Sequence, residues 1–79
     1  MKLKSVGSNM TVLEPNDNLS ILFSYETPVA AWISGRGYVK TDKFWSVTTS
    51  RHINKWIPLP CKLSKEPQEF FDNLVAGAK

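Results

Sequence analysis

Hydrophobic and polar residues form short strand-like runs through the first forty positions, with loose alternation over 2–6 and a run rich in Ile, Leu, Phe and Tyr over 19–25. Breaks rich in Gly, Asn and Pro divide this region into short runs, at residues 7–9, 15–18, 26–28 and 34–37. In the run 29–33, the odd-numbered side chains are expected on one face of a strand and the even-numbered ones on the other. Gly35 and Gly37 bracket Arg36 and can supply the positive φ angles of a hairpin turn. Residues 1–41 are therefore predicted to be mainly strands.

The apolar spacing becomes helical after residue 45. Ile53, Trp56 and Ile57 stand at i, i+3 and i+4, and Pro58 and Pro60 follow them, so a short helix is predicted over 46–57. A second, amphipathic helix is predicted over 66–76 at the C-terminal end. The predicted fold class is α+β, a small antiparallel β-meander of about five strands followed by two short helices packed on it.

Length and composition are those of one small folded domain. The chain has 79 residues, which predicts a single domain over 1–79, near the lower limit for a self-sufficient core. Hydrophobic residues make up 42% of it, which argues against intrinsic disorder. Cys61 is the one cysteine, so an internal disulfide is excluded and a reducing cytosol fits best. No continuous apolar stretch predicts a signal peptide or a membrane span.

Catalytic chemistry would have to use His52, the one histidine. Nucleophilic catalysis needs a histidine oriented by a carboxylate, with a hydroxyl or thiol in reach. Ser50 and Thr49 are too close in sequence to be placed like that nucleophile, so a local hydrogen-bonding role for His52 is favoured. One His, one Cys and scattered acids give no pair at metal-ligand spacing. We therefore expect no enzyme activity, no metal and no cofactor.

Positive charge is concentrated in the middle of a chain whose net charge is +3. Between residues 36 and 55, Asp42 is the one acid among several cations, and aromatic residues are interspersed with them. This pattern is typical of a surface that contacts a polar partner. The predicted contact residues are Arg36, Lys40, Lys43, Trp45, Arg51, His52 and Lys55.

The run Thr48, Thr49 and Ser50 has two interpretations. Free N–H groups at the start of a helix, together with hydroxyls and Arg51, can form an anion site. Consecutive hydroxyl residues before a helix are also the ordinary solution to capping, and this role is favoured. Whether Tyr38, Trp45 and Trp56 are exposed for binding or buried in the core stays open, and Phe44 is counted with the core aromatics.

Three segments carry a resemblance to a known family: residues 23–31, the pair Phe44–Trp45, and the run 48–56 with its T-T-S-R-H-I-N-K-W sequence. Together they resemble a family of very short bacteriophage-encoded proteins of unknown function, over about residues 19–57. The resemblance implies a viral origin and a location in the cytoplasm of an infected host bacterium. It implies no mechanism.

The predicted function is that of a non-enzymatic binding protein, which modulates a host or phage macromolecule by occupying its surface in a host-takeover or anti-defence role. A host or phage protein is the expected partner, and no membrane is involved. The first alternative is a nucleic-acid-binding accessory protein that uses the same basic and aromatic face. The second is a self-associating structural protein, with a homodimer formed through the C-terminal helix.

Overall fold

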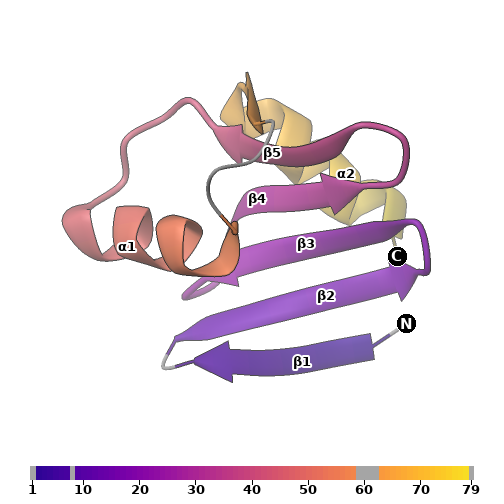
Figure 1. Cartoon of the computed structure of the whole chain (residues 1–79), viewed down its shortest axis with the longest axis horizontal. Helices are drawn as coiled ribbons and strands as arrows, with labels where there is room; N and C mark the ends of the chain where they lie inside the picture. Colours follow the sequence, from indigo (N-terminus) through magenta and orange to yellow (C-terminus); the bar gives the residue numbers. More distant parts are fainter. Residues whose placement is uncertain (1, 8, 59–62, 79) are drawn as a thin grey trace.

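One six-stranded sheet, with a helix on each of its faces, forms the fold in the computed structural model, which describes residues 2–7, 9–58 and 63–78 (Figure 1). The strands follow one another in space in the order β1-β2-β3-β4-β5-β6. Their bounds are β1 Lys2–Gly7, β2 Met10–Asn16, β3 Leu19–Ser24, β4 Thr27–Ile33, β5 Gly37–Thr41 and β6 Leu63–Glu66, and the helices are α1 Val47–Trp56 and α2 Gln68–Ala78. The predicted α+β class is confirmed.

The first five strands form the predicted antiparallel meander, but β6 was missed. It pairs parallel to β5, from Leu63 beside Tyr38 to Glu66 beside Thr41. A parallel pair needs a long crossover, and α1 lies within the crossover from β5 to β6. The second helix consequently starts at Gln68 rather than at residue 66.

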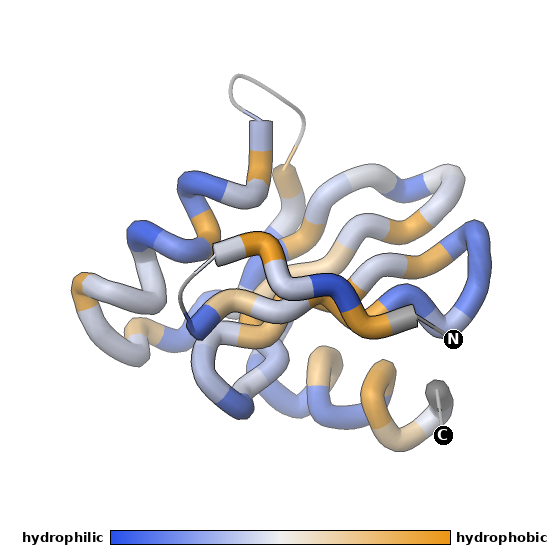
Figure 2. The backbone as a smooth tube through the Cα atoms, turned by 90° about the horizontal axis from the view of Figure 1, so that it is seen from below, coloured by the Kyte–Doolittle hydropathy of each residue, from blue (hydrophilic) through white to orange (hydrophobic). Residues whose placement is uncertain are grey.

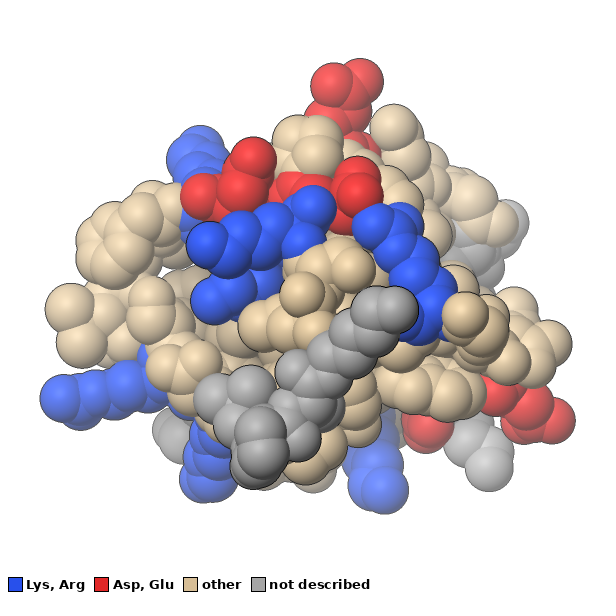
Figure 3. Space-filling model, turned by 45° about the horizontal axis from the view of Figure 1, so that its top comes forward, with Lys and Arg blue, Asp and Glu red and all other residues tan. Residues whose placement is uncertain are grey.

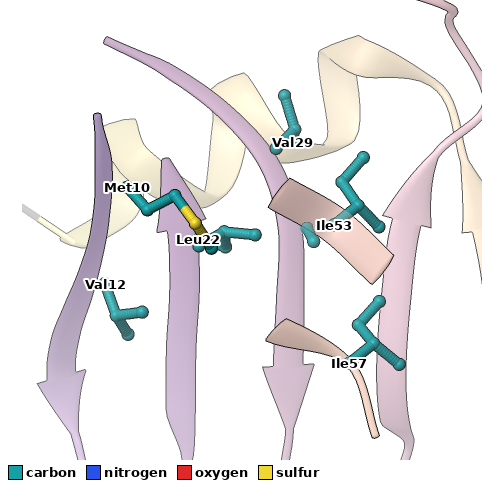
Figure 4. Close-up of a cluster of buried hydrophobic side chains, with 7 residues drawn as sticks. Met10, Val12, Leu22, Val29, Ile53 and Ile57 are labelled. Carbon is teal, nitrogen blue, oxygen red and sulfur yellow. The ribbon is translucent and has the colours of Figure 1, made fainter. Parts of the chain in front are cut away.

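The two helices cover opposite faces of the sheet, and each face has its own core. On one face, Ile53 of α1 and Ile57, the residue that follows the helix, pack on strand residues, as Figure 4 shows. On the other face, Phe71 of α2 is buried against Ala31 and Val39. Figure 2 shows α1 and the C-terminal helix on different sides of the strands, along which hydrophobic and hydrophilic positions alternate.

The predicted alternation in β4 is wrong at Val29. Leu22 pairs with Ala30 and Phe23 pairs with Pro28, so Val29 is the extra residue of a β-bulge. A bulge shifts the alternation by one residue, and both Val29 and Ala30 therefore lie in the core under α1.

Two local predictions concern the β4–β5 turn and the cap of α1. Gly35 and Gly37 have φ angles of 85° and 94°, so the glycine-based hairpin turn is confirmed. The cap lies earlier than predicted, because the Oγ of Ser46 accepts a hydrogen bond from the Thr49 N–H at 3.1 Å. Residues 48–50 therefore belong to the first turn of the helix. Of the helix-ending prolines, Pro58 follows α1, and Pro60 lies outside the described residues.

Neither described helix is both long and apolar enough to span a lipid bilayer.

Candidate functional site

An exposed apolar segment, residues Phe44–Val47, leads from the β5–α1 connection into the first residue of α1, and we call it the aromatic loop. The side chains of Phe44, Trp45 and Val47 are 72%, 40% and 61% exposed. Leu3 and Tyr25 are the other large hydrophobic residues exposed in the described part of the chain, and they lie on different strands or turns. The interpretation of Phe44 as a core residue is therefore wrong. Adjacent exposed apolar side chains of this kind are typical of contact sites.

The ring of Trp45 is held in place although the residue is 40% exposed. Its Nε1 donates a hydrogen bond to Oε1 of Gln68 at 3.0 Å, and the Lys43 Nζ lies 4.0 Å from its centroid. Nε2 of Gln68 in turn donates to the Pro28 carbonyl at 2.7 Å, which ties the arrangement to the start of β4. A ring fixed in this way loses little conformational freedom on binding.

A cavity of about 330 Å³ lies beside the aromatic loop, between α1 and the ends of β5 and β6, and we call it the basic hollow. Lys40 and Lys65 enter it as paired residues of neighbouring strands, and Lys43 lines it from the loop. Its other polar walls include Ser50 and Asn54 of α1. Three lysines therefore converge on one side of the molecule.

The seven predicted contact residues do not form one surface. Lys40, Lys43 and Trp45 lie at the basic hollow and the aromatic loop. Arg51 and Lys55 are exposed one turn apart on α1 and do not line the hollow. Figure 3 turns the β5 and β6 edge toward the viewer and shows Lys and Arg side chains gathered beside acidic ones.

Arg36 is committed to a contact within the chain. Its guanidinium makes an ion pair with Glu66 at 2.5 Å and lies 5.2 Å from the centroid of the Phe70 ring. These contacts place it on the α2 side of the sheet, whereas Lys40 and Lys65 face α1. Through these two contacts, Arg36 connects the β4–β5 turn to the region where β6 leads into α2.

His52, which is half-buried, belongs to a chain of hydrogen bonds with the buried residues Ser24 and Thr49. Its Nδ1 lies 2.8 Å from Oγ of Ser24, which is also 3.1 Å from Oγ1 of Thr49. Thr49 is buried, and Ser24 is only 2% exposed. This geometry docks α1 on the end of β3, and it leaves the Ser24 hydroxyl inaccessible to a bound molecule.

Of the three residues proposed as an anion site, only Ser50 lines the basic hollow. Thr49 is buried in the Ser24 contact, and Thr48 is exposed to solvent. The N–H of Thr49 is already bonded to the cap, and the N–H of Ser50 donates to the Ser46 carbonyl at 3.0 Å. The predicted anion site needed free N–H groups in the first turn of α1, and these two N–H groups already have hydrogen-bond partners.

Ser24→Ala is expected to lower the free energy of unfolding by about 1–3 kcal/mol, because it leaves Thr49 and His52 without their shared buried partner. Urea denaturation followed by tryptophan fluorescence measures this change. The control is Ser20→Ala, at a half-buried position of the same strand, which should change stability by less than about 0.5 kcal/mol. Equal effects of the two substitutions would contradict a stabilising role for the hydrogen-bonded chain.

Two residues of the site could not be found from the sequence pattern. Lys65 belongs to β6, whose pairing with β5 was not predicted, and Gln68 reaches partners 23 and 40 residues away.

Tyr38 and Trp56 are half-buried and pack edge to face, with ring centroids 5.4 Å apart, so they contribute to the core under α1. Within the described ranges, His, Asp and Glu do not gather in a group that could hold a metal ion, and Cys61 lies outside those ranges.

A family model, described as a family of unknown function (DUF8033), matches residues 1–73. The chain belongs to this family. No curated protein and no solved structure matches it significantly. The matched segment extends beyond residues 19–57, which carry the resemblance seen in the sequence, and it includes β6 and the beginning of α2. All residues of the aromatic loop and the basic hollow therefore lie within the matched segment.

Proposed function

We propose that the protein is a non-enzymatic binding protein that acts by occupying the surface of another protein through its aromatic loop. The observation that carries this proposal is the exposure of Phe44, Trp45 and Val47 in one short segment. Tryptophan is among the residues that dominate the energy of protein interfaces, and a ring that is already oriented binds at a lower entropic cost.

The resemblance to small bacteriophage proteins supports a more specific proposal for the partner and its location. In it, the partner is a host or phage protein in the cytoplasm of an infected bacterium, and binding blocks or redirects that protein. A small domain with a rigid core and one exposed apolar loop suits such a role, because occupying a surface requires no chemistry beyond complementary contact.

A protein partner fits the site better than the two alternatives. Single-stranded nucleic acid stacks its bases on several exposed rings along a basic track, whereas Tyr38 and Trp56 are packed on the core. A homodimer through α2 would need an apolar helix face, and Phe71 already uses that face to cover the sheet.

Phe44→Ser is expected to reduce recovery of the partner at least about tenfold when a tagged chain is cross-linked in bacterial cells and purified. The reason is the loss of the most exposed apolar ring of the aromatic loop. Quantitative mass spectrometry of the recovered proteins measures the change against the unmodified chain.

The matched control is Leu3→Ser, which removes an equally exposed apolar side chain from β1 and should leave recovery unchanged. If one stoichiometric protein is recovered equally with both variants, the aromatic loop is not the contact surface. If the unmodified chain recovers only itself, the role is self-association instead.

A further inference from the structure

We infer that the basic hollow binds carboxylate side chains of an acidic segment in the protein partner, next to the apolar contact made by the aromatic loop. This inference rests on the proposed function and names the chemistry of its partner. It predicts that the partner presents one or more Asp or Glu side chains beside an apolar side chain.

The lysines of the basic hollow repel one another. Lys40 and Lys65 are direct register partners on neighbouring strands, and Lys43 enters the same hollow. Like charges at directly opposite positions of a sheet destabilise it. Among the described residues, the one salt bridge joins Arg36 to Glu66, so no described carboxylate pairs with these lysines. An anion bound between them would relieve the repulsion.

Several hydrogen-bond donors surround the hollow. Each lysine carries three N–H donors on a flexible stem, and Ser50 and Asn54 add a hydroxyl and an amide from α1. A volume of about 330 Å³ has room for one or two carboxylate side chains. Phe44 also lines the hollow, so it joins this polar site to the aromatic loop.

The distribution of charge around the hollow favours an acidic protein segment over a nucleic acid. A nucleic acid needs a positive surface that follows its backbone over several phosphates. The basic hollow is instead local, with Asp42 among its own lining residues and acidic side chains beside the basic ones in Figure 3. The nearby cations Arg51 and Lys55 do not line the hollow. Charge arranged in this way favours short acidic groups over a long polyanion.

The test titrates octaglutamate into the isotope-labelled full chain at about 20 mM salt, with binding followed by NMR chemical shifts of the backbone amides. We expect saturable shifts at Lys40, Lys43, Ser50, Asn54 and Lys65. The double variant K40Q/K65Q should bind about tenfold more weakly, since two of the three converging charges are gone. It should fold at least as stably as the unmodified chain, because the substitution removes a like-charge pair.

The matched control is R51Q/K55Q, which removes the same net charge from α1 outside the hollow and should weaken binding by less than about threefold. Equal weakening by the two double variants would overturn the inference, since attraction to octaglutamate would then depend on net charge alone. Tighter binding of an oligothymidylate of similar length would also overturn it, in favour of a nucleic-acid site. Absence of saturable shifts would have the same consequence.

The proposed function and this inference can fail separately. Val47→Ser changes an exposed residue of the aromatic loop that does not line the basic hollow. This variant should keep its affinity for octaglutamate within about threefold while it recovers less of the captured protein, because octaglutamate has no apolar group to contact the loop. If capture depends on Phe44 but octaglutamate does not bind, the aromatic loop is a contact surface and the basic hollow is not an acid-binding site.

Discussion

Phe71→Ala is expected to lower the free energy of unfolding by about 3–5 kcal/mol, which is the range for truncating a fully buried aromatic side chain. Phe71 is the largest fully buried residue of the described chain, and it fills the space between α2 and the sheet. Its buried neighbours Ala31 and Val39 are small, so they cannot extend into the cavity that the substitution leaves. Loss of this contact would also loosen Gln68, which holds Trp45 from the first turn of α2.

A domain of this size has a total stability of roughly 4–12 kcal/mol, so the Phe71 variant should be partly or largely unfolded at room temperature. Urea denaturation followed by circular dichroism measures the change. Phe44→Ala is the matched control, because it removes the same atoms from an exposed position and should cost less than about 0.5 kcal/mol. A Phe71 variant as stable as this control would show that α2 does not contribute to the folded core.

The elements that could be predicted from the sequence are those whose signal is local. Turn residues separate the strand-forming runs of the meander, and the apolar stripe at residues 53, 56 and 57 marks α1 and its C-cap. Strand β6 has no such signal, because it is four residues long with Leu63 as its one apolar residue. Its position depends on hydrogen bonds to β5, which only the crossover through α1 brings within reach.

The difference between local signals and long-range strand pairing also explains which residues of the candidate site could be predicted from the sequence. Lys40, Lys43 and Trp45 could be predicted as contact residues because they lie close together in sequence. Lys65 could not, since its proximity to Lys40 follows from the pairing of β6. Arg36 was predicted to be available at a turn, but the same fold brings Glu66 to its guanidinium. A charge pattern therefore indicates that a basic region exists, and strand pairing decides which cations share a surface.

The aromatic residues illustrate a second limit of sequence patterns. Phe44 and Phe71 are chemically identical, yet the first is 72% exposed and the second is fully buried. Phe71 lies on the apolar face of a helix whose period predicts burial. Phe44 lies in an irregular connection, where no period applies and the direction of the side chain depends on the path of the chain.

Ile53→Ala is expected to lower the free energy of unfolding by about 2–5 kcal/mol and to weaken the binding of octaglutamate at the basic hollow. Ile53 is buried between α1 and the sheet, in contact with the core that includes Leu22 and Val29 (Figure 4). It also lines the basic hollow together with Ser50 and Asn54, so its side chain holds the helical wall of that cavity in position. Ile53→Ala is therefore expected to reduce both the stability of the fold and the affinity of the basic hollow for octaglutamate.

Urea denaturation gives the stability change for Ile53→Ala, and amide hydrogen exchange of residues 47–56 shows whether α1 opens before the sheet. Val47→Ala is the control on the same helix, because Val47 is exposed and its truncation should cost less than about 0.5 kcal/mol. Octaglutamate should bind the Ile53 variant more weakly even under conditions where the sheet remains folded. If affinity is unchanged while α1 exchanges faster, the helical wall is not required for the site, and the lysines of β5 and β6 alone form it.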